Sequence, residues 1–283
     1  MPFPPGAHRP LHIGRCRWLP VGWAQSRKGL RVALLTVDFF AETLEVGTSM
    51  MIVLPQVTAE QVGVEAAGVV TDFPVLYLLH GMSDDHTAWV RYTSVERYAA
   101  ERGLAVVMPA VHRSFYANER HGHAYWDFVS DELPRIVGNF VKVTADPART
   151  YVAGLSMGGY GALKLALNFP DRFAAAASLS GALDLRWLME RPERREEVSG
   201  RIFGGDLDAT EDLMALVERG QAPPLLIGCG TEDRLYDGNV AFAERARAVD
   251  LDVTTDFRIG DHEWSLWDAQ LPRVMDFVMG AGQ

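Results

Sequence analysis

The chain has 283 residues, 48% of them hydrophobic and 23% charged, and a formal net charge of −10. Such a chain is long enough and apolar enough to bury a large core, which excludes a wholly disordered protein. Its acidity does not favour a nucleic-acid backbone as partner, and no apolar run approaches the roughly 18 residues of a membrane-spanning helix. The two cysteines, Cys16 and Cys229, cannot build a disulfide framework, so we expect a reducing compartment, the cytoplasm.

The first 31 residues differ from the rest of the chain. They hold six Lys and Arg, five Pro and no Asp or Glu, and they show neither helical nor strand periodicity. No apolar stretch ends in a small-residue cleavage site, which argues against a secretory signal. We interpret residues 1–31 as a disordered tail or a misassigned start, with a transit peptide as the alternative. Residues 32–283 are expected to form one domain.

The domain begins with two runs that are rich in β-branched and aromatic residues, Ala33–Phe40 and Thr48–Leu54, which we expect to pair in antiparallel fashion. A loop-like connection, Thr58–Asp72, follows. Buried strands are then expected at Pro74–Leu79, Leu104–Met108, Thr150–Ala153, Phe173–Ser180, Pro224–Cys229 and Asp252–Arg258, and helices at Ser94–Arg102, Tyr125–Phe140 (interrupted by Pro134), Met157–Asn168, Asn239–Val249 and Glu263–Met279.

This alternation of strands and helices predicts an α/β fold, a doubly wound and mostly parallel sheet with helices on both faces. The segment Asp184–Asp208 does not fit the alternation. We expect it to be an insertion over one edge of the sheet and a candidate cap for a site there.

The sequence Gly154-Leu-Ser-Met-Gly158 stands between an expected strand and an expected helix. It matches G-x-S-x-G, the nucleophile elbow, in which a serine occupies a sharp strand-to-helix turn and the flanking glycines avoid a clash. The amides of the following helix N-terminus can stabilise negative charge. The motif in this context predicts that Ser156 is a nucleophile.

A serine hydroxyl needs a base, and the base needs an orienting acid. In folds with this elbow the acid and then the histidine follow the serine in the chain. Asp233 follows one late strand and His262 follows the next, so we expect these two residues to complete the triad. Glu232 is the rival acid, and Asp237 is a weaker one.

Two backbone amides are expected to stabilise the oxyanion. One is that of Met157, directly after the serine. The other is that of Met82, in the turn His80-Gly-Met-Ser83 after the strand Pro74–Leu79.

Aromatic residues near these loops are candidates for the substrate pocket, and core packing explains them equally well. We name Tyr116, Trp126 and Trp264 as the pocket candidates. The polar cluster Asp84-Asp-His86 and the histidines His112, His121 and His123 lack the spacing of a metal site, so neither a metal nor another cofactor is expected.

Four segments together resemble the tributyrin esterase branch of the esterase D family. They are Val75–Asp85, Met108–His112, Ala153–Lys164 and Gly230–Asp233. The resemblance runs from about Ala33 to the C-terminus. It implies an α/β-hydrolase fold, short acyl esters as substrates, and the same roles for Ser156, Asp233, His262, Met82 and Met157. The related S-formylglutathione hydrolases typically carry a histidine before the nucleophile and a cysteine in the oxyanion loop, where this chain has Leu155 and Gly81-Met-Ser83.

The sequence therefore predicts a serine carboxylesterase that acts on a small-molecule ester without a cofactor. The alternatives are an S-formylglutathione hydrolase, an acetyl esterase on acylated sugars, an acyltransferase, and a non-catalytic binding protein with a hydrolase fold. We expect the protein to bind neither nucleic acid nor a membrane. Homo-oligomerisation stays open.

Overall fold

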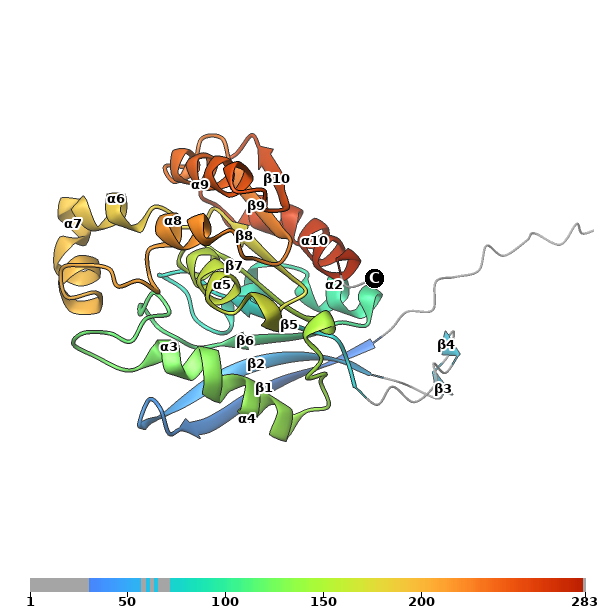
Figure 1. The fold of residues 1–283 in the computed structure, drawn as a ribbon. Coiled ribbons are helices and arrows are strands. Elements are labelled where there is room, and N and C mark those ends of the chain that lie inside the picture. The colour runs from blue at the N-terminus through green and yellow to red at the C-terminus, as the bar shows by residue number, and fades with distance from the viewer. Residues whose placement is uncertain (1–30, 57–59, 62–63, 66–71, 282–283) are drawn as a thin grey trace, which may run out of the picture.

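The computed structural model describes residues 31–56, 60–61, 64–65 and 72–281, and its centre is one twisted sheet (Figure 1). The predicted tail lies outside the described residues, apart from Arg31, where the first strand begins. The strands of the sheet are β1 (Arg31–Ala41), β2 (Val46–Gln56), β5 (Val75–Leu79), β6 (Ala105–Pro109), β7 (Thr150–Leu155), β8 (Ala175–Leu179), β9 (Leu225–Gly230) and β10 (Val253–Arg258).

The order across the sheet is β1-β2-β6-β5-β7-β8-β9-β10. The opening pair β1–β2 is antiparallel, β2 lies antiparallel to β6, and all the other pairings are parallel. This arrangement confirms the predicted doubly wound, mostly parallel sheet. Within the predicted connection 58–72, the short strands β3 (Glu60–Gln61) and β4 (Val64–Glu65) pair with each other, and residues 57–59, 62–63 and 66–71 lie outside the described residues.

The helices lie on both faces of the sheet, as predicted (Figure 1). One apolar core cluster joins the sheet to α4, α5 and α9, and a second joins its other face to α2 and α10. The described helices are α1 (Ala88–Tyr92), α2 (Val95–Arg102), α3 (Tyr125–Asp127), α4 (Leu133–Phe140), α5 (Met157–Asn168), α6 (Leu185–Glu190), α7 (Pro192–Arg194), α8 (Leu213–Leu216), α9 (Tyr236–Ala248) and α10 (Trp264–Gly280).

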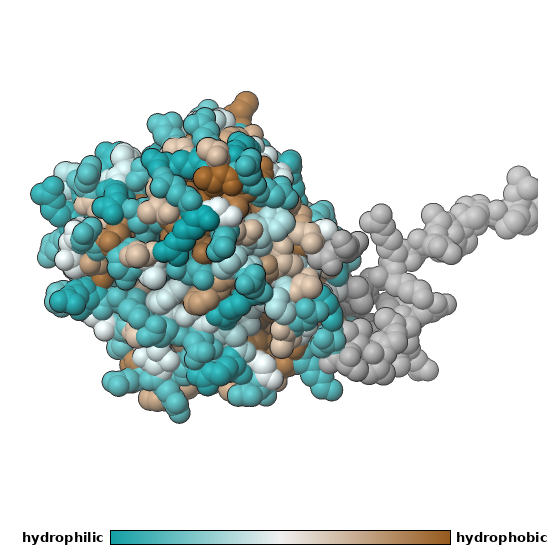
Figure 2. Space-filling model, viewed as in Figure 1, coloured by the Kyte–Doolittle hydropathy of each residue, from teal (hydrophilic) through white to brown (hydrophobic). Residues whose placement is uncertain are grey.

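The central strands β5 to β9 are buried along almost their whole length, which explains their continuous apolar runs. The face of the molecule seen in Figure 2 is mainly hydrophilic, with hydrophobic residues in small separate patches. None of the helices in the described part of the chain is both long enough and apolar enough to cross a membrane.

The segment Tyr125–Phe140 is helical, as predicted. The predicted interruption at Pro134 is not observed. The turn Phe128–Glu132 is a π-helix, and Pro134 stands in the first turn of α4, which begins directly after it. A proline has no amide hydrogen and its ring clashes with the preceding turn of a regular helix. The wider π-turn relieves this conflict at the junction, so the chain continues in the same direction.

Candidate active site

Ser156 is the single residue between strand β7 and helix α5. Its backbone angles, φ 54° and ψ −117°, lie in a region that residues other than glycine rarely adopt. The Ser156 amide donates to the Leu179 carbonyl at 2.9 Å, and the Ser156 carbonyl accepts from the Ala182 amide at 3.1 Å. These bonds hold the strained turn at the carboxyl edge of the sheet, where the hydroxyl stands clear of the strands.

The two glycines of the predicted elbow allow backbone segments to approach closely. A Cβ atom on Gly154 would lie 2.3 Å from the carbonyl oxygen of Gly158. A Cβ atom on Gly158 would lie 2.3 Å from the carbonyl oxygen of Leu79, at the end of β5. Any larger side chain at either position would therefore push α5 away from the sheet and displace the serine.

Three side chains from three separate loops form one hydrogen-bonded row at this edge. His262 Nε2 lies 3.0 Å from Ser156 Oγ, and His262 Nδ1 lies 2.7 Å from Asp233 Oδ2. Asp233 follows β9 and His262 follows β10, so neighbouring parallel strands deliver both residues to the serine. The structure brings the three predicted residues together in the geometry of a Ser-His-Asp triad.

The carboxylate of Asp233 is buried and hydrogen-bonded on both oxygens. Its Oδ1 accepts the Leu235 amide at 2.9 Å, while its Oδ2 faces His262. Burial alone raises the pKa of Asp233, but the hydrogen bond and the charge of His262, with the Leu235 amide and the Ser180 hydroxyl, lower that pKa below its usual range. Asp233 is therefore ionised at neutral pH and can accept the imidazole N–H.

Two further residues support Asp233 and His262. Trp267 stands near His262 in the sequence, where it is a candidate to pack the loop of the base or to line the pocket, whereas Ser180 is a residue that the sequence did not single out. The ring of Trp267 meets the His262 imidazole edge to face, with 4.9 Å between the ring centroids. The Trp267 indole N–H donates to Ser180 Oγ at 3.1 Å. Ser180 follows β8 in a left-handed conformation (φ 47°) that turns its side chain toward Asp233. The only sequence feature that could have indicated Ser180 is its position at the end of a strand, which it shares with Asp233 and His262.

The rival acids lie away from the imidazole. Glu232 is exposed, and its amide donates to the Gly260 carbonyl at 3.0 Å. Asp237 stands in the first turn of α9 and lines a different hollow. Among these three carboxylates, Asp233 alone contacts His262.

The two predicted oxyanion residues flank the serine on different elements. Met157 is the first residue of α5, where helix amides have no partner within the helix. Met82 stands in the turn that the Asp84 amide closes onto the Gly81 carbonyl at 3.2 Å. A Cβ atom on Gly81 would lie 2.8 Å from the end of the Leu155 side chain and 3.6 Å from the Ser156 Cβ atom, so this turn passes close to the serine. Met82 and Ser156 line the same cavity.

The buried His80 anchors that turn from below. Its Nδ1–H donates to the Gly81 carbonyl at 2.7 Å, and its Nε2 accepts the Val111 amide at 3.1 Å. The bond from Val111 requires a ring nitrogen without hydrogen, so the two bonds together fix the neutral ring with its hydrogen on Nδ1. Burial lowers the pKa of His80 to about 4, although the bond to Gly81 and the nearby Asp85 oppose the shift.

We expect the fold to lose stability through His80 as the pH falls from 6.5 toward 4. Between these pH values the His80 ring binds a proton in the unfolded state but not in the folded state. The stabilisation of the fold by neutral His80 is therefore complete above pH 6.5 and is lost toward pH 4. The loss at pH 4.5 should reach about 2–3 kcal/mol. Urea unfolding at pH 7.5 and 4.5 measures it, with His80→Gln expected to lose less than wild type. The exposed His121→Gln variant is the control, and equal losses in all three proteins would contradict the assignment.

Ser156 lines a cavity of about 240 Å³. Apolar walls come from Phe115, Leu188, Leu235 and two tryptophans, and Trp264 is the predicted pocket residue that lines it. A shallower hollow adjoins the cavity beyond the Met82 turn, where the rings of His112 and His123 pack against Tyr125.

The prediction that Tyr116 and Trp126 line the pocket is wrong. Tyr116 is fully buried, and its hydroxyl donates to the His80 carbonyl at 3.0 Å, so it supports the oxyanion turn from the core. Trp126 stacks on Phe169 with 5.7 Å between ring centroids, away from the cavity.

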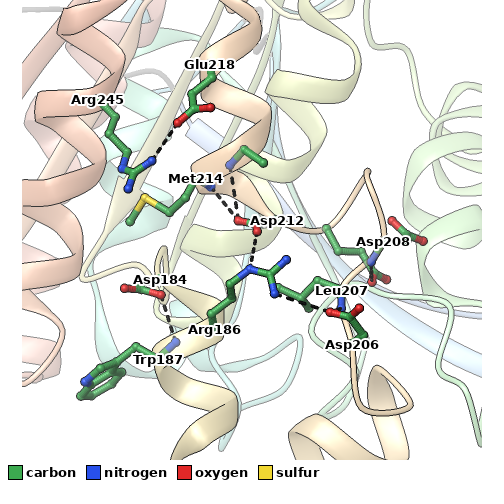
Figure 3. Close-up of polar contacts among 12 residues, drawn as sticks. Asp184, Arg186, Trp187, Asp206, Leu207, Asp208, Asp212, Met214, Glu218 and Arg245 are labelled. Atoms are coloured by element: carbon green, nitrogen blue, oxygen red, sulfur yellow. Dashed lines mark hydrogen bonds and ion pairs between the residues drawn. The ribbon is translucent and has the colours of Figure 1, made fainter.

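The segment Asp184–Asp208, which the sequence set apart, is folded and fixed to the body of the protein. Figure 3 shows Arg186 of α6 between the carboxylates of Asp206 and Asp212, at 3.5 and 2.6 Å. Asp212 also caps the start of α8, and Asp184 caps α6 by accepting the Trp187 amide at 3.0 Å. The segment reaches the cavity through Leu188 and Arg194.

Comparison with known proteins agrees with this fold. The family model described as "Putative esterase" matches residues 61–277. The acetyl esterase of Caldicellulosiruptor saccharolyticus is 25% identical over 266 residues, 87% of this chain and 98% of that protein. Two solved Staphylococcus aureus structures are each 31% identical and cover 88% of this chain and 99% of their own. They are FphF, a fluorophosphonate-binding serine hydrolase (TM-score 0.78), and the S-formylglutathione hydrolase FrmB (TM-score 0.76). The chain therefore belongs to this esterase family, within the wider group that includes FrmB, and is a carboxylic ester hydrolase with the α/β-hydrolase fold.

Proposed function

We propose that this protein is a serine carboxylesterase for short acyl esters, with Ser156 as nucleophile, His262 as general base and acid, and Asp233 as the orienting acid. The observation that carries the proposal is the unbroken row from Ser156 Oγ through His262 to Asp233, with distances of 3.0 and 2.7 Å, at the wall of a cavity.

The chemistry follows from this row. His262 Nε2 takes the proton of Ser156 as Oγ attacks the ester carbonyl carbon, and the imidazolium then gives that proton to the departing alkoxide. Water repeats the sequence on the acyl-enzyme, releases the carboxylic acid and restores the serine. The amides of Met82 and Met157 would donate to the carbonyl oxygen when it becomes negative, a contribution of about 3–4 kcal/mol per donor in enzymes of this type.

The preference for short acyl groups rests on the cavity and on the resemblance to tributyrin esterases. The apolar side chains of Leu188, Trp264 and Trp267 face the nucleophile across a volume of about 240 Å³. The segment Asp184–Asp208 acts in this proposal as a fixed cap, because its ion pairs hold Leu188 in the wall.

A second candidate is hydrolysis of S-formylglutathione. The observation in its favour is the similarity to FrmB, which is 31% identical over 88% of this chain. The triad would perform the same steps on a thioester, so only the substrate separates the two functions.

We expect initial rates on p-nitrophenyl esters, from acetyl to dodecanoyl, to peak between acetyl and butyryl. The short esters fit between the serine and the apolar wall, whereas longer chains must leave the cavity. S-formylglutathione belongs in the same series. A thioester rate that exceeds every ester rate would favour the second candidate function, hydrolysis of S-formylglutathione. A peak at long chains would contradict the short-acyl proposal.

A further inference from the structure

The wall of the catalytic cavity has the opposite charge to the protein as a whole. The chain carries 27 Lys and Arg against 37 Asp and Glu. The cavity, in contrast, is lined by three arginines (Arg113, Arg194 and Arg234) and one carboxylate, Asp84, apart from the histidine of the triad. A concave site with one sign of charge attracts ligands of the other sign, whatever the net charge of the protein.

Three arginines around the cap and its rim, Arg113, Arg186 and Arg201, are already paired with carboxylates. Arg113 donates to both carboxylate oxygens of Glu197, one at 2.6 Å. Arg201 pairs with Glu119 and with Glu197, and Arg186 lies between the two carboxylates seen in Figure 3. These guanidinium groups hold the structure together and have little capacity left for a ligand.

Arg194 and Arg234 differ from them. Within the described part of the chain, neither side chain has a hydrogen bond or a carboxylate within 4 Å. The charge of Arg194 contributes to lowering the pKa of Glu197, but both carboxylate oxygens of Glu197 accept hydrogen bonds from Arg113. Arg194 and Arg234, which line the same cavity as Ser156, thus have no hydrogen-bond or ion-pair partner among the described residues.

Both residues are placed by rigid neighbours. Arg234 directly follows Asp233, whose carboxylate the Leu235 amide and His262 hold in place. Arg194 ends α7, and α7 packs against the cap helix α6, which is fixed to the body of the protein. Between them the apolar side chains of Leu188 and Leu235 line the same cavity. A ligand that reaches this side would meet an apolar surface with guanidinium groups at its border.

Solvated surface arginines are common, and the hollow next to Arg234 also contains Asp184 and Asp237. Asp184 is occupied as the cap of α6, and neither carboxylate lines the catalytic cavity. Arg234 therefore borders both hollows, and the catalytic cavity has no lining carboxylate other than Asp84.

We propose that the substrate of this esterase carries a carboxylate, or a comparable anionic group, that Arg194 and Arg234 bind beside the scissile ester. This inference rests on the proposed function and narrows its substrate class to anionic esters. The arginines act in recognition, since neither touches the reacting atoms in the triad.

Matched pairs of esters test the proposal. Monomethyl glutarate and methyl valerate differ by an anion on the acyl side, whereas 4-acetoxybenzoate and its methyl ester differ by an anion on the alcohol side. The measured quantity is the ratio of kcat/KM for the anionic ester to kcat/KM for its neutral partner. We expect this ratio to favour the anion by about tenfold or more in one pair, the effect of one charge-assisted hydrogen bond. The pair that responds shows which side carries the anion.

The variants Arg194→Gln, Arg234→Gln and the double variant should reduce that ratio toward one. Arg234→Glu should reverse it. Because each ratio is taken within one protein, a general loss of activity cancels. Arg135→Gln, on α4 away from the cavity, removes the same charge and should keep the wild-type ratio.

The outcomes separate the two proposals. If the neutral esters are hydrolysed through Ser156 but neither pair shows a preference for the anion, the esterase stands and the anionic class is overturned. If the preference exists but survives in the double variant, the assignment to these arginines is overturned. If no ester is hydrolysed by the folded wild type, the proposed function fails and the inference fails with it.

Discussion

Replacing Ser156 by alanine should lower kcat/KM on p-nitrophenyl butyrate by about six decades, the loss expected when a triad acts as a unit. The variant keeps the cavity and the oxyanion amides but has no oxygen to form the acyl-enzyme. The backbone turn at this residue (φ 54°) should be kept in the variant, because its hydrogen bonds to Leu179 and Ala182 are made by backbone atoms and not by the hydroxyl. Initial rates and thermal unfolding of the same preparation separate lost chemistry from lost structure.

The matched control is Ser49→Ala, whose hydroxyl bonds to Asp38 on the strand pair β1–β2, away from the cavity. It should retain wild-type activity. A fluorophosphonate probe should label the wild type and Ser49→Ala, but not Ser156→Ala. Near-full ester hydrolysis by folded Ser156→Ala would falsify the assignment of the nucleophile.

Asp233→Asn should lower kcat by about ten-thousand-fold with little change in structure. In the wild type, Oδ1 accepts the Leu235 amide and Oδ2 accepts the His262 Nδ1 hydrogen. The asparagine oxygen will take the first position, because an amide donor faces it there. The asparagine NH₂ then faces His262 Nδ1, and the ring must carry its hydrogen on Nε2. An imidazole in that tautomer cannot accept the proton of Ser156.

The kinetic loss should be accompanied by the loss of the downfield proton NMR signal expected of the hydrogen bond between Asp233 and His262. Glu232→Gln removes the adjacent carboxylate, which does not contact the imidazole, and should retain both the signal and the activity. A fall of less than tenfold in Asp233→Asn, or a fall in Glu232→Gln of the same size as in Asp233→Asn, would mean that the acid has been assigned wrongly.

The sequence predicted the sheet and the triad geometry because both depend on local patterns repeated in a fixed order. The continuous apolar run Pro74–Leu79 is typical of a strand that is buried on both faces, and it appears as the central strand β5. Gly158 lies so close to the Leu79 carbonyl that no larger residue fits there. The pentapeptide Gly154–Gly158 therefore identifies the elbow in the sequence. Asp233 and His262 could be found because parallel strands end at one edge.

The features that the sequence did not predict depend on how loops turn and pack. Nothing in the composition around Tyr116 shows that its backbone has φ 51° and sends the ring into the core. Arg194 and Arg234 look like ordinary surface charges in the sequence, and the fold alone shows that both line one cavity. Ser180 is likewise one serine among many in the sequence, and only the tertiary structure brings it to Asp233.

The segment Asp184–Asp208 lies between β8 and β9, whereas the three residues of the proposed triad stand on the loops after β7, β9 and β10. Natural selection can therefore act on the two parts separately. A substitution or a change of length in residues 184–208 alters two positions of the cavity wall, Leu188 and Arg194, and leaves the reacting groups where they are. Duplicated copies of such a gene can diverge in the ester they accept while inheriting the same hydrolytic apparatus.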